Sequence, residues 1–267
     1  MRYDVNLSIL FTELPLLERA AAARQAGFAA VEFWWPFDRA VPGDAEVEAF
    51  VRSLTDAGVS LAGLNFFAGD MSAGDRGLVS WIGREKEFAD SVEVAIGIAD
   101  RLGCHTFNAL YGNRIDGVPP EAQDELAVSN LDFAAAAAKR IGGTLVIEPL
   151  SGAERYPLRT AAGALDVIAK VDRDNLALLF DLYHLAVNGD DLDAVIARHL
   201  ESVGHVQIAD VPGRHQPGTG SLDIEGYLAK LAANGYDGYV GLEYVPEGPS
   251  AESFGWLRSN REWRQAR

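Results

Sequence analysis

The chain has 267 residues, 48% of them hydrophobic, and a formal net charge of −16. This length and apolar content suit one α/β barrel with a large core. The acidic balance disfavours binding to nucleic acid or to an anionic membrane, whereas a small anionic substrate is compatible if local cations or a metal offset the field. No apolar run approaches the roughly 20 residues of a membrane span.

The single cysteine, Cys104, cannot form an intramolecular disulfide and fits a reducing cytoplasm. The N-terminus lacks a basic region followed by an apolar run, so no secretion signal is expected. The sequence therefore predicts a cytoplasmic protein.

Strand-like and helix-like segments alternate along the chain. The expected strands are residues 4–11, 29–35, 60–67, 105–110, 144–148, 177–181, 204–209 and 239–244. The expected helices are residues 16–26, 44–57, 78–102, 121–141, 160–172, 190–200 and 223–234, with another helix closing the chain. Asp223 can cap the helix that follows it. Five glycines stand where a left-handed residue would end a helix: Gly27, Gly58, Gly103, Gly142 and Gly235.

Eight strand–helix units in a chain of this length indicate a (β/α)8 TIM barrel. A doubly wound open sheet is the alternative, but it would more often have a glycine-rich first turn, where this chain has Leu10-Phe-Thr-Glu-Leu. No composition shift or linker divides the chain, so we expect residues 1–267 to form a single barrel domain.

Four of the expected strands end in a residue with a side-chain oxygen. These residues are Glu148, Asp181, Gln207 and Glu243, each separated from the next by about one strand–helix unit. In a barrel, the ends of the fifth to eighth strands converge on one mouth. An acidic residue at a strand end is often a helix cap, but four at this spacing are harder to explain by capping. The sequence predicts that they bind one divalent cation (Mg²⁺ or Mn²⁺, with Co²⁺ possible), because hard cations prefer oxygen ligands.

His184 follows Asp181 by three residues, just beyond the sixth strand. There we expect it to form a hydrogen bond with a substrate oxygen. His105 and His205 open strands at the opposite end of the barrel and are expected to be structural.

The chain resembles the hydroxypyruvate isomerase family of the xylose-isomerase-like barrel superfamily, which also contains ketose 3-epimerases and endonuclease IV-type nucleases. The resemblance runs nearly end to end. Among the segments that carry it are Val31-Glu-Phe-Trp-Trp-Pro36, Leu64-Asn-Phe-Phe-Ala-Gly-Asp70, Ile147-Glu-Pro-Leu150, Phe180-Asp-Leu-Tyr-His184 and the stretch 204–220. The last is the most specific, because related epimerases usually have a histidine at the position of Gln207. Two departures are Ser151, where the family usually has asparagine, and Ser221, where it commonly has glutamate.

The resemblance implies a metal-dependent isomerase that interconverts hydroxypyruvate and tartronate semialdehyde through an enediolate. It also implies that Glu148 and Glu243 transfer the proton in addition to binding the metal. Arg214 is our candidate for binding the substrate carboxylate. The expected pocket wall comes from the ends of strands two to four: Trp34, Phe66, Phe67, Asn108 and Tyr111. The glycine-rich loop 69–77 is expected to cover the mouth.

Three other functions compete with this interpretation. The nearest is a 2-oxo-tetronate isomerase or a ketose 3-epimerase that uses the same metal site. A metal-dependent phosphodiesterase or nuclease would need more histidine ligands than five scattered histidines provide. A non-catalytic sugar-acid binder could retain the barrel. Members of the resembled family often form dimers or tetramers, so a homo-oligomer is also expected.

Overall fold

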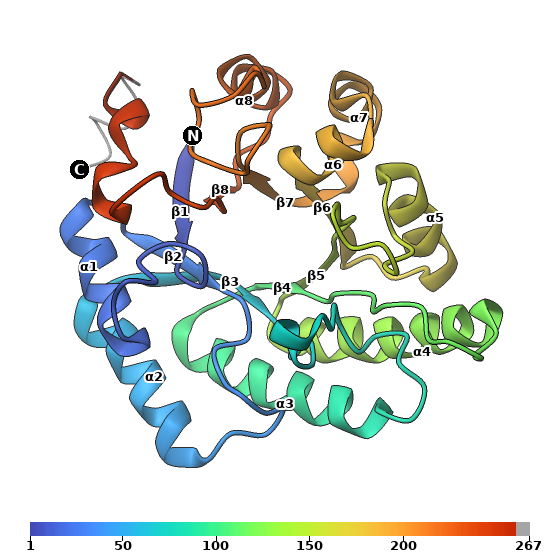
Figure 1. The fold of residues 1–267 in the computed structure, drawn as a ribbon. Helices are drawn as coiled ribbons and strands as arrows, with labels where there is room; N and C mark the ends of the chain where they lie inside the picture. Colours follow the sequence, from blue (N-terminus) through green and yellow to red (C-terminus); the bar gives the residue numbers. More distant parts are fainter. Residues whose placement is uncertain (260–267) are drawn as a thin grey trace.

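The computed structural model describes residues 1–259, and eight parallel strands close into a barrel in chain order (Figure 1). The predicted (β/α)8 TIM barrel is therefore confirmed. The strands are β1 (Arg2–Asn6), β2 (Ala30–Phe33), β3 (Ser60–Asn65), β4 (Thr106–Asn108), β5 (Thr144–Ile147), β6 (Leu176–Asp181), β7 (Val203–Ile208) and β8 (Tyr239–Leu242).

Helices surround the barrel on the outside (Figure 1). They are α1 (Arg19–Ala26), α2 (Asp44–Ala57), α3 (Glu85–Leu102), α4 (Pro120–Lys139), α5 (Ala161–Val171), α6 (Leu182–Asn188), α7 (Leu192–His199) and α8 (Ile224–Ala233). The five glycines predicted to end helices all have positive φ, from 67° at Gly58 to 107° at Gly27. Asp223 caps α8 as predicted, because its side chain accepts a hydrogen bond from the Gly226 amide.

Most predicted ends shift by a few residues at most, but the first strand and the third helix differ more. The first strand ends at Asn6, because a turn starts there: the Asn6 side-chain oxygen accepts from the Ser8 amide, and its carbonyl accepts from the Leu10 amide. The helix expected from residue 78 begins at Glu85. Residues 78–84 form a loop that is tied to the fourth strand–helix connection by a hydrogen bond from the Ser80 amide to the Tyr111 carbonyl.

Short helix α6 was not predicted. It starts directly after β6 because Asp181 caps it, accepting hydrogen bonds from the amides of Tyr183 and His184. This cap fixes the position of His184 relative to Asp181.

At the end of the chain, the described residues form two 3₁₀ helices, Ser250–Glu252 and Gly255–Ser259, where a closing helix was expected. The remainder of that expected helix lies outside the described residues. This segment lies beside α1 (Figure 1). Phe254 anchors it through ring contacts with Phe28 at 4.7 Å and Phe11 at 5.9 Å.

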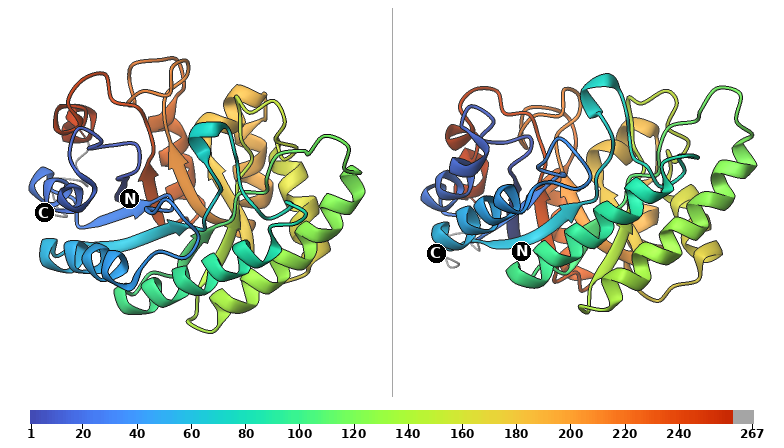
Figure 2. Two further views of the ribbon diagram at one scale, coloured as in Figure 1. Left: turned by 60° about the horizontal axis from the view of Figure 1, so that its bottom comes forward. Right: turned by 90° about the horizontal axis from the view of Figure 1, so that it is seen from below.

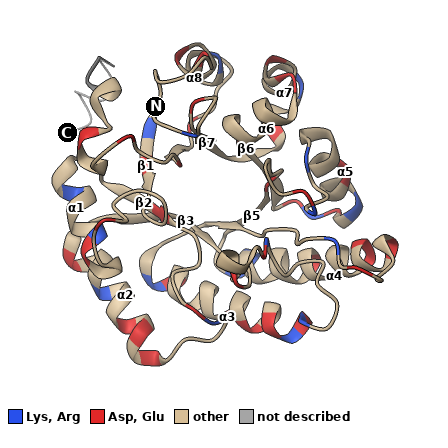
Figure 3. Ribbon diagram, in the orientation of Figure 1, with Lys and Arg blue, Asp and Glu red and all other residues tan. Residues whose placement is uncertain are grey.

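The barrel presents its charges outward and its functional loops to one end. Many Lys, Arg, Asp and Glu residues lie on the outer helices, and others lie in the loops (Figure 3). The loops that follow the strands rise together on one side, with the 3₁₀ helix Met71–Ala73 among them (Figure 2). Within residues 1–259, every helix is too short or too polar to cross a membrane.

Candidate functional site

The four predicted ligands lie on neighbouring strand ends at one rim of the barrel. Asp181 is the last residue of β6, and Gln207 lies in β7 one residue before its end. Glu148 and Glu243 directly follow β5 and β8. The strand register pairs Asp181 with Gln207, and Gln207 with Gly241. The four residues therefore stand at the ends of four successive strands, and all four side chains are buried there.

In both Glu148 and Asp181, one carboxylate oxygen accepts a hydrogen bond and the other does not. Glu148 Oε2 accepts a hydrogen bond of 2.7 Å from the Asn108 amide nitrogen, and Asp181 Oδ1 caps α6. Glu148 Oε1 and Asp181 Oδ2 are buried with no hydrogen-bond partner among the described residues. Asp181 therefore does cap a helix, which is the alternative role that the sequence suggested for an acidic residue at a strand end. The cap uses only Oδ1, so Oδ2 could still bind a metal ion.

In the side-chain amide of Gln207, the nitrogen forms hydrogen bonds and the oxygen does not. Its Nε2 donates to Glu32 Oε1 at 2.7 Å and to Glu243 Oε2 at 2.5 Å, so its carbonyl oxygen faces away from both carboxylates. That Oε1 atom is buried without a partner in the described part of the chain. Asn6 Nδ2 donates to the same two carboxylates, at 3.1 Å to Glu32 and 2.8 Å to Glu243.

These residues fit a hard divalent cation. Three buried oxygens lack partners, and unsatisfied buried acceptors are rare because leaving one unpaired is unfavourable. Amide and carboxylate oxygens are the ligands that Mg²⁺ and Mn²⁺ prefer. Glu148, Asp181, Gln207 and Glu243 could hold such an ion, with Glu243 offering the oxygen that Arg214 now contacts.

The crowded carboxyls are strongly perturbed without a cation. Burial raises the pKa of Glu148 well above its usual value, and the neighbouring charges of Glu243 and Asp181 raise it further. Burial also raises the pKa of Glu243, to about 8, although Arg214 and a hydrogen bond from Trp34 partly oppose the shift. A bound cation would oppose both shifts, because it favours the charged form of each carboxyl.

Arg214 lies inside the same site. Its Nη2 contacts Glu243 Oε1 and lies 4.0 Å from Asp181 Oδ2. Its guanidinium also sits over the Tyr183 ring at 5.6 Å, and its Nε is buried without a partner among the described residues. Arg214 has a φ of 58°, so its backbone adopts a left-handed conformation that non-glycine residues rarely take. The arginine predicted to bind a substrate carboxylate is thus already paired with a protein carboxylate.

His184 faces the site as a neutral hydrogen-bond donor. The Ser151 amide donates to its Nδ1 at 3.0 Å, and Ser151 Oγ lies 2.7 Å from the same atom. Burial lowers the pKa of His184 to about 4, so the ring is neutral at pH 7. Because Nδ1 accepts, the single ring proton is on Nε2.

That proton also distinguishes two possible roles for His184. Its Nε2 lies 3.7 Å from Glu148 Oε1 and 3.9 Å from Asp181 Oδ2, close enough for the three side chains to share an ion. A protonated nitrogen has no lone pair for a metal, however. This geometry therefore favours the predicted role of a donor to a substrate oxygen.

The residues predicted to form the pocket wall divide into two groups. Trp34 lines the cavity above the quartet, and Asn108 holds Glu148. Phe66 points the other way: its ring stacks on Phe107 at 5.4 Å and meets Phe88 edge-on, outside the cavity. Alternation along the chain explains this, because Asn65 takes the cavity-facing position before it. Phe67 lines the adjoining cavity, and Tyr111 donates to Asp124 on α4.

The cavity above the quartet has a volume of about 380 Å³, within the usual range for small-ligand sites. Several residues that shape it were not singled out from the sequence. Asn6 and Glu32 orient Gln207 and Glu243, Ser151 orients His184, and Arg76 lines the wall opposite the quartet. For Glu32, the available signal was a charged residue inside the otherwise apolar strand β2. Asn6 ends β1, which already contains Arg2 and Asp4, so the same signal does not mark it.

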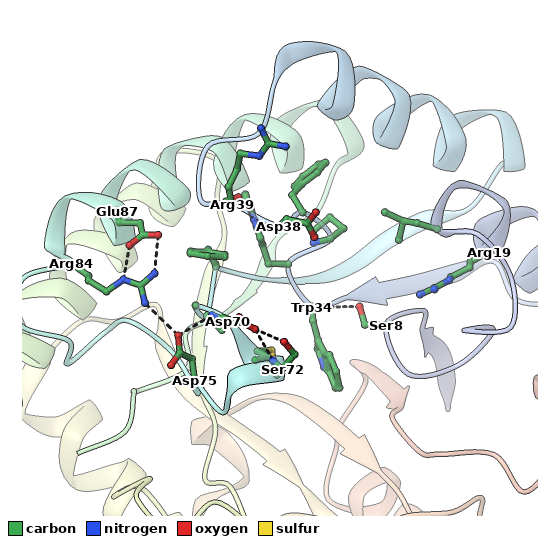
Figure 4. A pocket seen from close by; sticks show the side chains of 18 residues that line it. Ser8, Arg19, Trp34, Asp38, Arg39, Asp70, Ser72, Asp75, Arg84 and Glu87 are labelled. Carbon is green, nitrogen blue, oxygen red and sulfur yellow. Dashed lines mark hydrogen bonds and ion pairs between the residues drawn. The ribbon is translucent and has the colours of Figure 1, made fainter. Parts of the chain in front are cut away.

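A second cavity of about 880 Å³ adjoins the first, and Trp34, Met71 and Ser72 line both (Figure 4). Most of the charged side chains that line this second cavity form hydrogen bonds or ion pairs within the protein. Asp70 caps the 3₁₀ helix Met71–Ala73 and bonds Ser72, while Arg84 joins Asp75 and Glu87. The loop predicted to cover the mouth therefore forms the partition between the two cavities.

Below the quartet, a further polar group lies inside the barrel. His205 Nε2 contacts Glu32 Oε2 at 2.7 Å, and both are buried. Both carboxylate oxygens of neighbouring Asp4 lack a hydrogen-bond partner among the described residues, and burial together with Glu32 raises the pKa of Asp4 well above its usual value. His205 thus supports Glu32 from within the barrel.

Comparison with known proteins places this geometry in a family. The model for the xylose isomerase-like TIM barrel matches residues 20–260. A protein of Streptomyces coelicolor provisionally named hydroxypyruvate isomerase is 54% identical over 265 residues, covering 96% of this chain and 95% of its own. Hydroxypyruvate isomerase of Escherichia coli is 34% identical, with 96% and 98% covered. The 2-oxo-tetronate isomerase of Cupriavidus necator is 33% identical, with 96% and 97% covered.

Among solved structures, one from Brucella melitensis described as an AP endonuclease of family 2 superposes with a TM-score of 0.89. It is 35% identical, and the match covers 97% of this chain and 99% of that one. The relatives match almost the whole chain, including all the strand ends that carry the quartet. The chain belongs to the hydroxypyruvate isomerase family of xylose isomerase-like TIM barrels, and it is an isomerase-type enzyme that acts on sugar acids.

Proposed function

We propose that this enzyme interconverts hydroxypyruvate and tartronate semialdehyde with one divalent cation held by Glu148, Asp181, Gln207 and Glu243. The observation that carries the proposal is the set of three buried, unpartnered oxygens on the first three of these residues. Glu243 completes the set from the adjacent strand end. A binding module with no metal would be expected to satisfy these oxygens within the protein.

When bound, a divalent cation would polarise the carbonyl and hydroxyl oxygens of the substrate and acidify the C–H bond between them. Glu148 and Glu243 follow the two outer strands of the quartet, so they can flank a small substrate. One carboxylate removes the proton from one carbon and the pair returns it to the neighbouring carbon, through an enediolate. Either glutamate can act first, because closely coupled carboxyls share their titration.

Several other residues support this transfer. His184 donates from Nε2 to the substrate oxygen on which charge develops, and the Ser151 amide holds the ring in that tautomer. Arg214 stabilises the ionised form of Glu243 through their contact. Trp34 and the 3₁₀ helix Met71–Ala73 cover the mouth and exclude water from the enediolate.

A 2-oxo-tetronate isomerase reaction is the second candidate. It uses the same proton transfer on an acid that is one carbon longer, and a relative with that name matches nearly the whole chain. A ketose 3-epimerase would use the same metal site on a neutral sugar. The same metal site serves all of these reactions, because each substrate carries adjacent hydroxyl and carbonyl groups.

The direct test incubates metal-stripped protein with hydroxypyruvate, 2-oxo-tetronates and free ketoses, with and without added Mn²⁺ or Mg²⁺, and follows the products by NMR. We expect hydroxypyruvate to be converted only when metal is present, with one metal ion per chain. A lack of activity on every α-hydroxycarbonyl compound would overturn the proposal. Three metal ions per chain with phosphodiester cleavage would favour the nuclease class.

A further inference from the structure

An acid that enters this cavity meets mostly negative charge. Glu148 and Glu243 line it, Asp181 lies beside them, and the whole chain carries −16. A substrate carboxylate therefore needs a cation within reach that is not already neutralised. In the described part of the chain, only two side chains that line the cavity carry a positive charge at pH 7, those of Arg214 and Arg76, because His184 is neutral.

Arg214 already has protein partners. Its Nη2 is in contact with Glu243 and 4.0 Å from Asp181, and Tyr183 lies against its guanidinium plane. To bind a substrate carboxylate with the same nitrogen, Arg214 would have to leave Glu243. That exchange would give up one charge-assisted hydrogen bond to form another.

Arg76, in contrast, forms no ion pair with a carboxylate among the described residues. Its Nη1 donates to two backbone carbonyls of its own loop, Met71 at 3.1 Å and Asp75 at 2.7 Å. These bonds hold the guanidinium in place without neutralising its charge. Its Nε and Nη2 have no hydrogen-bond partner, and no carboxylate lies within 4.0 Å of it, among residues 1–259.

The backbone around Arg76 is also fixed. The Gly112 amide donates to the Arg76 carbonyl, and the Gly77 amide donates to the Ala68 carbonyl. Arg76 belongs to the loop between β3 and α3, whereas the quartet follows β5 to β8, so the arginine and the proposed cation site face each other across the mouth.

We propose that Arg76 binds the carboxylate of the substrate, and that it makes the enzyme selective for hydroxy-oxo acids over neutral ketoses. This inference rests on the proposed function. A substrate that meets the quartet with its hydroxyl and carbonyl oxygens extends its carboxylate toward the opposite wall. The planar guanidinium fork of Arg76 presents two free donors to that carboxylate.

The test measures equilibrium binding of two probes to the Mn²⁺-loaded protein by calorimetry. Glycerate carries the carboxylate and cannot isomerise, because it lacks a carbonyl group. Dihydroxyacetone is neutral and keeps the hydroxycarbonyl unit. The variants are Arg76→Met, Arg76→Lys and Arg214→Met. Arg39→Met is the matched control, because Arg39 lines only the adjoining cavity and pairs with Glu46.

We expect Arg76→Met to weaken glycerate binding about 10- to 100-fold and to change dihydroxyacetone binding less than about threefold. Arg76→Lys should be intermediate, because it keeps the charge and loses the fork. Equal losses for both probes would mean that Arg76 only supports the loop, and would overturn the inference. A loss specific to glycerate in Arg214→Met but not in Arg76→Met would also overturn it. If the unmodified protein binds neither probe, the proposed function itself fails.

Discussion

The amide of Gln207 can present either an oxygen or a nitrogen to a metal, and only the oxygen is a ligand. Glu32 sets this choice: its Oε1 accepts from Gln207 Nε2 at 2.7 Å, which engages the nitrogen and leaves the Gln207 oxygen without a partner in the described part of the chain. Groups that orient ligands in this way typically change metal affinity by 10- to 100-fold when removed.

Glu32→Ala should therefore weaken Mn²⁺ binding about 10- to 100-fold, measured by electron paramagnetic resonance or calorimetry. Glu32→Gln should retain most of the affinity, because its carbonyl oxygen can accept from Gln207 while its nitrogen faces His205. Asp4→Asn is the matched control, since Asp4 is buried nearby but makes no hydrogen bond with Gln207. Unchanged Mn²⁺ affinity in a folded Glu32→Ala protein would contradict this role.

Glu148→Gln should abolish proton transfer while leaving the fold intact. We expect the turnover number to fall by about 10²- to 10⁴-fold. The metal-free protein should not lose thermal stability, because burial already raises the pKa of Glu148 and favours its neutral form. Turnover within tenfold of the unmodified enzyme would remove Glu148 from the reaction.

At the level of single residues, the sequence indicates the four residues of the quartet better than the residues that support them. Glu148, Asp181, Gln207 and Glu243 each end an apolar strand at barrel spacing, and the structure brings them to one rim. Glu32 is a single charged residue within a strand, and its partner Gln207 is far away along the chain. Only the closed barrel reveals that pairing. The position of Phe66 depends on which face of β3 points inward, which its aromatic character does not determine.

The loop between β3 and α3 is the element that carries Arg76, and its geometry depends on Gly77. The φ of Gly77 is 109°, and a Cβ atom there would lie 1.9 Å from the Leu110 carbonyl oxygen. That oxygen belongs to the backbone and cannot move without displacing the segment after β4.

Gly77→Ala should therefore lower stability by more than the roughly 1–3 kcal/mol of backbone strain alone, and should weaken glycerate binding by displacing Arg76. Gly74→Ala is the matched control: its φ is 102°, but nothing lies within 4 Å of the added Cβ. Thermal unfolding of the two variants provides the comparison. Equal destabilisation of both would show that the contact with Leu110 has no effect.

Elements could be predicted where apolar periodicity and terminating glycines agree. The eight strands are confirmed, although their ends shift by a few residues. Apolar periodicity does not predict α6, because the helix has only seven residues and its start depends on capping by the Asp181 side chain. The apolar residues Leu78 and Val79 predict a helix that starts at residue 78. In the structure they are buried in a loop that precedes α3.

For the whole molecule, metal binding and proton binding should oppose each other. The pKa of Glu243 is raised to about 8, above its ordinary value of 4.5, and that of Glu148 is raised in the same direction. Between pH 4.5 and about pH 8, the folded metal-free protein keeps a proton on Glu243 that the unfolded chain has lost. Folding stability from these groups therefore falls as pH rises through this window, by up to about 1.4 kcal/mol per pH unit for each group.

We expect the metal-free protein to melt at a lower temperature at pH 8 than at pH 6, and this difference to shrink in Glu243→Gln, where the group cannot ionise. Added Mn²⁺ should raise the melting temperature more at pH 8, because fewer protons compete for the carboxylates. Scanning calorimetry at both pH values, with chelator or Mn²⁺, measures this. A pH-independent effect of Mn²⁺ would contradict the linkage.

The most direct test of the central claim is the anomalous diffraction of a crystal grown with Mn²⁺. We expect one strong peak per chain at the barrel mouth, about 2.0–2.3 Å from oxygens of Glu148, Asp181, Gln207 and Glu243, with His184 Nε2 outside the coordination sphere. A peak bound through His184 instead of Gln207, or no peak at this rim when the ion is present in excess, would contradict it.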